Sequence, residues 1–309
     1  MKNICKLKYK VYITIRKLIM HIIVRCHPKY DKKYKLSICA IFKDEAPFLA
    51  EWVNYHAMLG VEHFYLYNNN STDNYKEVLN PFIQRGLVTV KPWTKNFAQM
   101  EVYKDFYETQ RHKTQWVAFL DVDEFICPIE KNSIIEWLYN YDKYPAILIN
   151  FKFFGTGGKT KHDYSRLVTE QYIHCWDELS PYGKSIVNTD YDIVEFDYKT
   201  NHCPTLFYPF CGRGLQVTPI DQYKRFATYA EPSSPLFGAG KKTIQLNHYW
   251  CKAFDIYKGK MNRNDAFFKN NPRRDLKYFY ENEFHVTSAD YTIFKYIMKL
   301  KLYISDEER

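Results

Sequence analysis

Three carboxylates follow a short apolar run in the segment WVAFLDVDEFICP, residues 116 to 128. Asp121 and Asp123 are separated by one residue, and in an extended chain that spacing points both side chains the same way. Two carboxylates held close together repel each other unless a cation lies between them. A hard divalent ion such as Mn²⁺ or Mg²⁺ would bind both and bridge them to a diphosphate. The spacing therefore predicts an ion and diphosphate site here, against the simpler alternative of a solvated acidic loop.

Polar side chains also follow two earlier apolar runs, residues 35–42 and residues 61–67. Carboxylate and amide groups at such positions can hydrogen-bond a uracil base or a ribose hydroxyl. We therefore expect a nucleoside site here, and its candidate residues are Asp44, Glu45, Asn68, Asn70 and Asp73. The run of asparagines is equally compatible with ordinary turn formation.

Alternating strand-like and helix-like segments position these groups. The strand-like runs are residues 35–42, 61–67, 87–93, 115–120 and 146–154, and the helical segments between them are 46–60, 73–86, 98–114 and 133–141. Such alternation implies parallel crossovers. We predict an α/β fold with a doubly wound, mostly parallel sheet that has helices on both faces, plus a C-terminal helical region. Ligands of such sheets bind beyond the carboxyl ends of the strands, where the polar groups fall.

Several blocks of the chain resemble glycosyltransferase family 92 and its bacterial relatives, which have the GT-A fold. In the order of the family, the blocks are CAIFKDEAPFLAEWVNYHAMLGVEHFYLYNNNSTDN, WVAFLDVDEFICP, NFKFFGTGGK, GKSIVNTDYD with TNHCP, and LNHYWCKAFDIYKGKMNRND. The resemblance covers residues 35 to 265, and the first two blocks are its most specific part. The chain departs from the family at Asp44, where many relatives have Asn, and around Lys252, at Cys251 and Ala253.

The resemblance implies a metal-dependent, inverting glycosyltransferase. Such an enzyme would move a hexose from a UDP-sugar, for example UDP-galactose, to a hydroxyl group of a glycan or glycolipid. Members of this fold often bring a late histidine to the metal or the diphosphate, so the resemblance implies His248 as a further metal ligand. A lone histidine is as often structural.

Two lysines and three acids complete the candidate site. On a helix, Lys252 would share a face with His248, four residues earlier, and would neutralise the diphosphate. Lys184 is a second candidate for the diphosphate, and either lysine can instead be an ordinary solvated side chain. An inverting transfer also needs a base for the acceptor hydroxyl. The candidates are Glu170, Asp177 and Glu178, of which Glu170 fits the resemblance best although each can be a surface acid.

The net charge of +9 indicates an anionic partner. We divide the chain into a basic N-terminal segment (residues 1–34), the glycosyltransferase domain (35–265) and a helical extension (266–309). A helix in the N-terminal segment would carry Ile15, Leu18, Ile19, Ile22 and Ile23 on one side. This segment lacks the pattern of a signal peptide and is too short and charged to span a bilayer. We expect it to pack on the domain or to lie on an anionic membrane surface.

Eight cysteines are scattered without a CxxC pair, which argues against a zinc ribbon and for reduced thiols. We therefore expect a cytoplasmic protein, peripheral on the inner face of the membrane if its N-terminal segment binds there. A metal-dependent nucleotidyltransferase remains an alternative, but it would normally have a Gly-rich basic loop where this chain has FKDEAPF. A second alternative is a basic nucleic-acid-binding module, which should interleave aromatic residues with Lys and Arg on one face of a sheet. In this chain acidic residues cluster at the predicted strand ends instead, so we expect no nucleic-acid partner. The sequence makes no prediction of oligomeric state.

Overall fold

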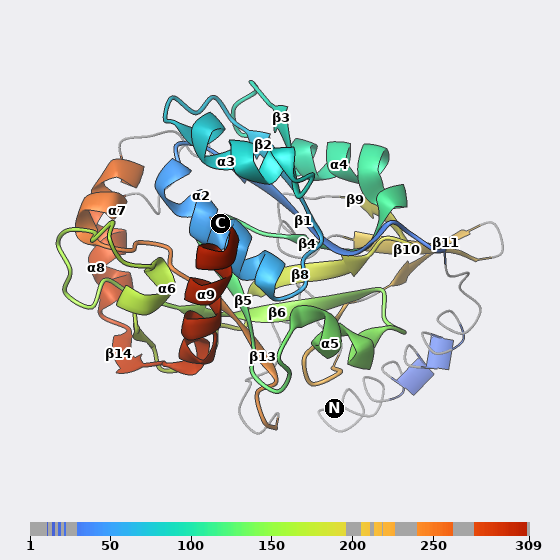
Figure 1. Cartoon of the computed structure of the whole chain (residues 1–309). Helices are drawn as coiled ribbons and strands as arrows, with labels where there is room; N and C mark the ends of the chain where they lie inside the picture. The colour runs from blue at the N-terminus through green and yellow to red at the C-terminus, as the bar shows by residue number, and fades with distance from the viewer. Residues whose placement is uncertain are drawn as a thin grey trace.

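A computed structural model describes residues 30–195, 205–210, 213–217, 219–225, 240–261 and 275–307, and six helical residues between 11 and 22. Its centre is a nine-stranded sheet with the order β3-β2-β1-β4-β8-β6-β13-β5, and β12 pairs with β6 (Figure 1). The strands are β1 (Tyr34–Phe42), β2 (His63–Asn68), β3 (Val88–Pro92), β4 (Thr114–Phe119), β5 (Glu124–Pro128), β6 (Ala146–Phe153), β8 (Gly183–Asn188), β12 (Ile220–Asp221) and β13 (Ile244–His248).

Most strand pairs of this sheet are parallel. β1 to β4 pair in parallel, as do β12 and β13 with β6, whereas β8 and β5 run antiparallel to their neighbours. The predicted fold class, an α/β fold with a mostly parallel sheet, is confirmed.

Helices cover both faces of the sheet. Alternate residues of β1 point into different cores, Ile38 and Ala40 into the larger one and Cys39 and Ile41 into the second. Side chains of α2, α3 and α5 complete the larger core, and side chains of α4 complete the second, so α4 covers the opposite face. These helices are α2 (Ala46–Met58), α3 (Tyr75–Gln84), α4 (Gln99–Gln110) with the 3-10 turn η1 (Arg111–Lys113), and α5 (Ile134–Leu138) with η2 (Tyr139–Tyr141).

The strand tips that carry the predicted site meet at one edge of the sheet. Phe42 and Asn68 are paired at the ends of β1 and β2, and β4 ends beside them. His248 is paired with Phe153 where β13 and β6 end. Because β8 is antiparallel to β4 and β6, it begins at this edge, with Lys184 as its second residue.

The C-terminal part of the chain packs on this core. Its elements, with those that adjoin it, are α6 (Val168–Gln171), β7 (His174–Trp176), α7 (Phe254–Met261), α8 (Leu276–Glu283), β14 (Val286–Ala289), η3 (Thr292–Tyr296) and α9 (Ile297–Glu307). The described residues of this region are mainly helical, as expected, except that β14 pairs with β7 in a small sheet. α9 lies against α2 (Figure 1). A third sheet contains β9 (Asp192–Glu195), β10 (Thr205–Phe210) and β11 (Arg213–Val217).

Two expectations from composition concern the parts of the chain that the structure describes. Within these parts, no helix combines the length and apolar character needed to cross a bilayer. The described cysteines, Cys39, Cys127, Cys175 and Cys251, are buried free thiols. Ile23 of the predicted N-terminal helix lies outside the described residues, and the three proposed segment boundaries stay predictions.

Candidate active site

Asp121 lies just beyond the end of β4. Its Oδ1 accepts a hydrogen bond from Gln99 Nε2 at 2.8 Å, and its Oδ2 accepts one from Lys184 Nζ at 3.0 Å. The Lys184 side chain is 2% exposed and the Asp121 side chain 37%. Gly183 permits β8 to lie close against β6, because a side chain there would collide with the carbonyl oxygen of Ile149. A buried strand thus delivers a positive charge to an acid that faces solvent.

Asp123 has different partners. Its Oδ2 accepts a hydrogen bond from Lys260 Nζ at 2.5 Å, and its Oδ1 lies 3.5 Å from His248 Nε2. Burial would raise the pKa of Asp123, but the positive charge of Lys260, with contributions from His248 and Lys252, outweighs burial and holds that pKa well below its usual range. Asp123 is therefore an ionised carboxylate that is already paired with a cation.

The expected extended geometry of these two acids is wrong. Val122 and Asp123 form a turn, closed by a 3.0 Å hydrogen bond from the Glu124 N–H to the Asp121 carbonyl oxygen, and β5 starts directly after it. A turn is required because β5 pairs with β13 rather than continuing beside β4. The carboxylates consequently have separate cationic partners, and their joint binding of a metal ion stays a prediction.

Glu124 stabilises the turn by a hydrogen bond to its backbone. It is fully buried, and its carboxylate accepts a hydrogen bond from the Asp121 N–H at 2.9 Å and lies 3.7 Å from Lys184 Nζ. Burial raises the pKa of Glu124 well above its usual range, with Lys184 opposing that rise and Asp121 and Asp123 adding to it. For Lys184, burial acts to lower the pKa, but Asp121 and Glu124 raise it well above the usual range. The two acids thus favour the charged form of Lys184, and Lys184 offsets part of the rise in the pKa of Glu124.

Asp44 and Asp73 connect the loops that follow β1 and β2. Asp44 Oδ1 accepts a hydrogen bond from the Thr72 N–H at 2.7 Å, and Asp73 Oδ2 accepts one from the Ala46 N–H at 2.8 Å. Asp44 has φ 50°, a left-handed conformation that Asp and Asn adopt more readily than most residues. Glu45 is buried at the N-cap position of α2. The structure brings these predicted residues together at the same edge.

Asn68 and Asn70 form the second of these loops. Buried Asn68 accepts a hydrogen bond from the Ser71 N–H at 3.0 Å and donates one to the Tyr75 hydroxyl at 2.9 Å. Asn70 also has a left-handed backbone, with φ 56°, and donates to the Thr94 carbonyl oxygen at 2.8 Å. These hydrogen bonds are typical of a turn, which is the alternative that the sequence allowed for the run of asparagines. The role of both residues in nucleoside binding stays a prediction.

The prediction that Lys252 and His248 share a helical face is wrong. His248 ends β13, whose pairing with β5 and β6 keeps it extended, and Lys252 lies in the connection between β13 and α7 with φ 52°. Lys252 is buried, with Nζ 4.2 Å from the centre of the Phe48 ring. Burial raises the pKa of Glu51, and the charge of Lys252 offsets part of that rise. Its role in binding the diphosphate remains a prediction.

The three candidates for the base lie apart from the acidic turn, residues 121–124. Glu170 is on α6 and accepts a hydrogen bond from Lys301 Nζ at 3.0 Å. Asp177 and Glu178 are exposed and follow β7. Between described residues, no hydrogen bond or ion pair joins any of the three to the acidic turn. The structure does not test which of them acts as the base.

Lys260, Gln99 and Glu124 contact the predicted acids and were not expected from the sequence. Lys260 lies in α7, 137 residues after Asp123, within the block LNHYWCKAFDIYKGKMNRND that carries the resemblance, but nothing in that block indicated a contact with Asp123. Gln99 opens α4, and no local pattern distinguishes it. Glu124 was visible as the third acid of the segment, but nothing in the spacing indicated that it is buried.

The donor atoms at this edge are of the kinds that Mn²⁺ and Mg²⁺ accept. Asp121 and Asp123 offer carboxylate oxygens and His248 an imidazole nitrogen. Over the described parts of the chain, no three His, Cys, Asp or Glu side chains are gathered closely enough to hold an ion as they stand. An ion bound to Asp123 would take the place of the Lys260 ammonium group. The chemical types of these residues therefore fit a divalent ion, and in this structure lysine ammonium groups neutralise the two acids.

Comparisons with known proteins agree with the sequence resemblance. The model of glycosyltransferase family 92 matches residues 32–232. A glycosyltransferase family 92 protein of Ricinus communis is 38% identical over 255 residues, which is 79% of this chain and 39% of that protein. One of Oryza sativa subsp. japonica is 32% identical over 244 residues, 75% of this chain and 37% of that protein. The chain thus spans less than half the length of these relatives.

A more distant relative carries a more specific name. A galactan beta-1,4-galactosyltransferase of Arabidopsis thaliana is 30% identical over 141 residues, 41% of this chain and 26% of that protein. Among solved structures, S. aureus TarS residues 1–349 is similar with a TM-score of 0.33 at 15% identity, covering 50% of this chain and 47% of that chain.

Proposed function

Because the chain belongs to glycosyltransferase family 92, we propose that it transfers a hexose from a UDP-sugar to a hydroxyl group of a glycan or glycolipid. The observation that supports this most is the arrangement at the strand edge. Two acids lie there, and each is paired with a lysine from a different element. Asp121 pairs with Lys184 of β8, and Asp123 pairs with Lys260 of α7. Such alternating charges suit a divalent ion and a diphosphate, and the edge is where doubly wound sheets bind ligands.

In this proposal Asp121, Asp123 and His248 hold Mn²⁺ or Mg²⁺, which would neutralise charge on the diphosphate. Lys184 and Lys252 add fixed positive charge beside the leaving UDP. Both ammonium groups are buried, where charges interact more strongly than in water. The loops of Asp44, Glu45, Asn68, Asn70 and Asp73 hold the nucleoside, and hydrogen bonds within and between the loops keep their backbone in place.

We propose an inverting transfer. The acceptor oxygen forms its bond to the anomeric carbon as the bond to UDP breaks, and a carboxylate takes the hydroxyl proton. Glu170, Asp177 and Glu178 are the candidates for this base. The Asp177 carbonyl oxygen accepts a 2.7 Å hydrogen bond from buried Lys152, which fixes the backbone that carries its exposed carboxylate, whereas Glu170 is held by Lys301.

Galactose is the proposed sugar, because the Arabidopsis relative is named a galactosyltransferase. We further propose that the acceptor is a glycan or lipid-linked molecule reached at the cytoplasmic face of a membrane. The basic N-terminal segment supports this placement, since clustered Lys and Arg are attracted to anionic lipids.

A donor screen tests the proposal. The protein is incubated with Mn²⁺ and each of UDP-galactose, UDP-glucose and UDP-N-acetylglucosamine, and released UDP is measured. We expect UDP release to be fastest from UDP-galactose. Pyrophosphate release from a nucleoside triphosphate and a sugar phosphate, with no UDP release from any UDP-sugar, would instead identify a nucleotidyltransferase.

A further inference from the structure

The positive charge of the chain is concentrated at its N-terminus. Residues 1–35 contain eleven Lys or Arg and a single Asp, a net charge of +10, whereas the complete chain carries +9. The remainder of the chain is therefore nearly neutral, at −1. An anionic partner that is attracted by charge should approach this end of the protein.

An exposed apolar stripe lies within this basic segment. Val11, Ile15, Leu18 and Ile22 are helical and 50%, 51%, 61% and 51% exposed, respectively. Their spacing of four, three and four residues places them on one side of a helix. Ile19 instead packs against the second core of the domain. Among the described residues of this helix, Ile19 therefore contacts the domain while the four residues of the stripe are exposed to solvent.

An open pocket of about 690 Å³ lies at the edge of the sheet opposite the acidic turn, where β1 and β2 begin. The Asp, Lys and His residues among those that line it are Asp31, Lys32, Lys33, His63, His112 and Lys113. The first three directly precede β1 and belong to the same basic stretch of sequence, residues 1–35, as the apolar stripe.

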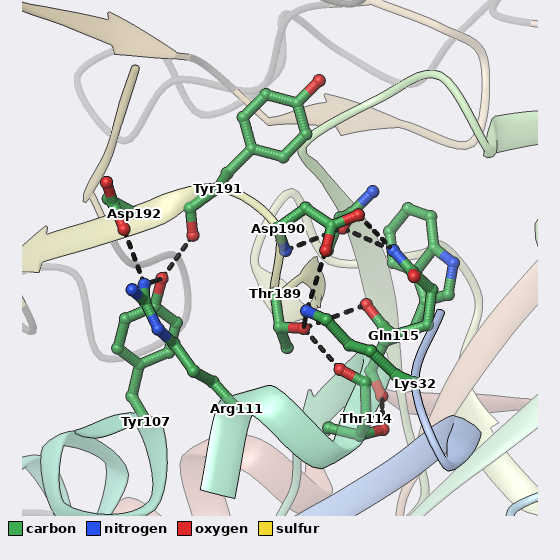
Figure 2. Close-up of polar contacts among 11 residues, drawn as sticks. Lys32, Tyr107, Arg111, Thr114, Gln115, Thr189, Asp190, Tyr191 and Asp192 are labelled. Carbon is green, nitrogen blue, oxygen red and sulfur yellow. Dashed lines mark hydrogen bonds and ion pairs between the residues drawn. The ribbon is translucent and has the colours of Figure 1, made fainter. Parts of the chain in front are cut away.

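Lys32 fixes this stretch to the domain (Figure 2). Its Nζ lies 2.8 Å from Asp190 Oδ1 and 2.5 Å from Thr189 Oγ1. The side chains of Lys32 and Asp190 are 6% and 2% exposed, so this ion pair is shielded from solvent. Lys32 therefore serves as an anchor, and the exposed Lys33 that follows it is held at the pocket.

Lys33 and Lys113 are the cations that a ligand in the pocket would meet. Lys33 Nζ lies 4.8 Å from the centre of the Tyr34 ring, which stacks on His63, and Lys113 Nζ donates to the side-chain carbonyl of Gln110 at 3.0 Å. Among the residues that the structure describes, neither lysine has a carboxylate partner. Burial lowers the pKa of His63 to about 4, and both lysines add to that effect, so their charges converge on this ring.

We propose that this pocket binds the phosphate of an anionic lipid headgroup, while Val11, Ile15, Leu18 and Ile22 insert into the membrane interface. The two features are complementary, because lysines bind phosphate and an apolar helical side inserts between headgroups. The inference rests on the proposed membrane-surface acceptor for its purpose. Its test uses neither donor nor acceptor, so it can fail while the proposed transferase activity stands, and the reverse also holds.

The experiment is co-sedimentation of the full chain with vesicles of phosphatidylcholine alone or mixed with phosphatidylglycerol. We expect binding only to the mixed vesicles. The double variant Lys33→Gln/Lys113→Gln should bind about 30-fold more weakly, since each lysine near an anionic surface contributes about fivefold. The control Lys277→Gln/Lys299→Gln removes the same charge from exposed positions on α8 and α9 and should bind within about twofold of the unchanged protein. Thermal unfolding confirms that each variant is folded.

Three results would overturn the proposal. Equal weakening in both double variants would show that net charge alone matters and that the pocket is not a site. Binding of inorganic phosphate without binding of mixed vesicles would assign the pocket to a small phosphate ligand. Dimerisation that is lost in Leu18→Ser/Ile22→Ser, seen by sedimentation velocity without vesicle binding, would assign the stripe to a second copy of the chain.

Discussion

Replacing Lys184 by Met tests the charge balance beneath the acidic turn. Lys184 is buried, 3.0 Å from Asp121 and 3.7 Å from fully buried Glu124. Removing one member of a buried ion pair typically costs about 3–5 kcal/mol, because the remaining charge is left uncompensated. Asp121 is partly exposed and keeps contact with water, so most of the cost should arise at Glu124.

Glu124 also limits that cost, because it can take up a proton. Keeping a carboxyl group of ordinary pKa 4.5 protonated at pH 7 costs about 3.4 kcal/mol, at about 1.36 kcal/mol per pH unit. At pH 5 the cost of keeping this carboxyl group protonated is only about 0.7 kcal/mol. In the unchanged protein Lys184 opposes the rise in the pKa of Glu124. Without Lys184 the folded variant should keep the Glu124 proton to a higher pH, so its loss of stability relative to the unchanged protein should shrink as the pH falls toward 5.

Urea unfolding at both pH values measures this effect. We expect the midpoint of Lys184→Met to fall by about 1 M or more at pH 7 and by much less at pH 5. Adding Glu124→Gln removes the group that must be protonated, so the double variant should recover stability at pH 7 and lose the pH dependence. A loss below about 1 kcal/mol at pH 7, or an equal loss at both pH values, would refute the reasoning.

Three further variants probe neighbouring contacts. Buried His56 has a pKa of about 3, below its ordinary 6.5. The unfolded state therefore takes the proton first, and acidification from pH 7 to 5 should cost the unchanged protein about 2 kcal/mol more than His56→Gln, by urea unfolding. Lys260→Met frees Asp123 from a charged hydrogen bond and should tighten Mn²⁺ binding about tenfold by calorimetry, whereas unchanged affinity would show that the ammonium does not compete. Asp44→Ala should weaken UDP binding about fivefold without changing Mn²⁺ binding. Asp44→Asn should leave UDP binding unchanged, because Asn retains the hydrogen-bond acceptor for the Thr72 N–H. Equal effects of both changes on UDP binding would contradict this.

Local patterns were sufficient for strands β1, β2, β3, β4 and β6 and for the edge where the candidate acids lie, but they did not predict β5, β8, β12 and β13. β1 carries apolar side chains on both faces because helices cover both, and this reads as a continuous apolar run. Asp44, Asn68 and Asp121 follow such runs, and parallel pairing alone brings their strand ends to one edge.

The partners of these residues depend on long-range contacts that no local pattern records. Asp123 meets Lys260 only because α7 follows β13, which inserts between β6 and β5. Lys252 has the spacing of a helix relative to His248, but strand pairing overrides it. Sequence spacing therefore predicted which acids lie at the edge and failed to predict which cations neutralise them.

Metal-dependent release of UDP from a UDP-sugar by Asp123→Asn is the most direct test of the central claim. Turnover of the unchanged protein should require Mn²⁺ or Mg²⁺. Asp123→Asn should lose at least about 100-fold, because a bound ion stabilises developing charge by several kcal/mol. Glu281→Gln, which changes an exposed acid of α8 by the same atoms, should retain full turnover. Metal-dependent turnover in Asp123→Asn equal to that of Glu281→Gln would contradict the account.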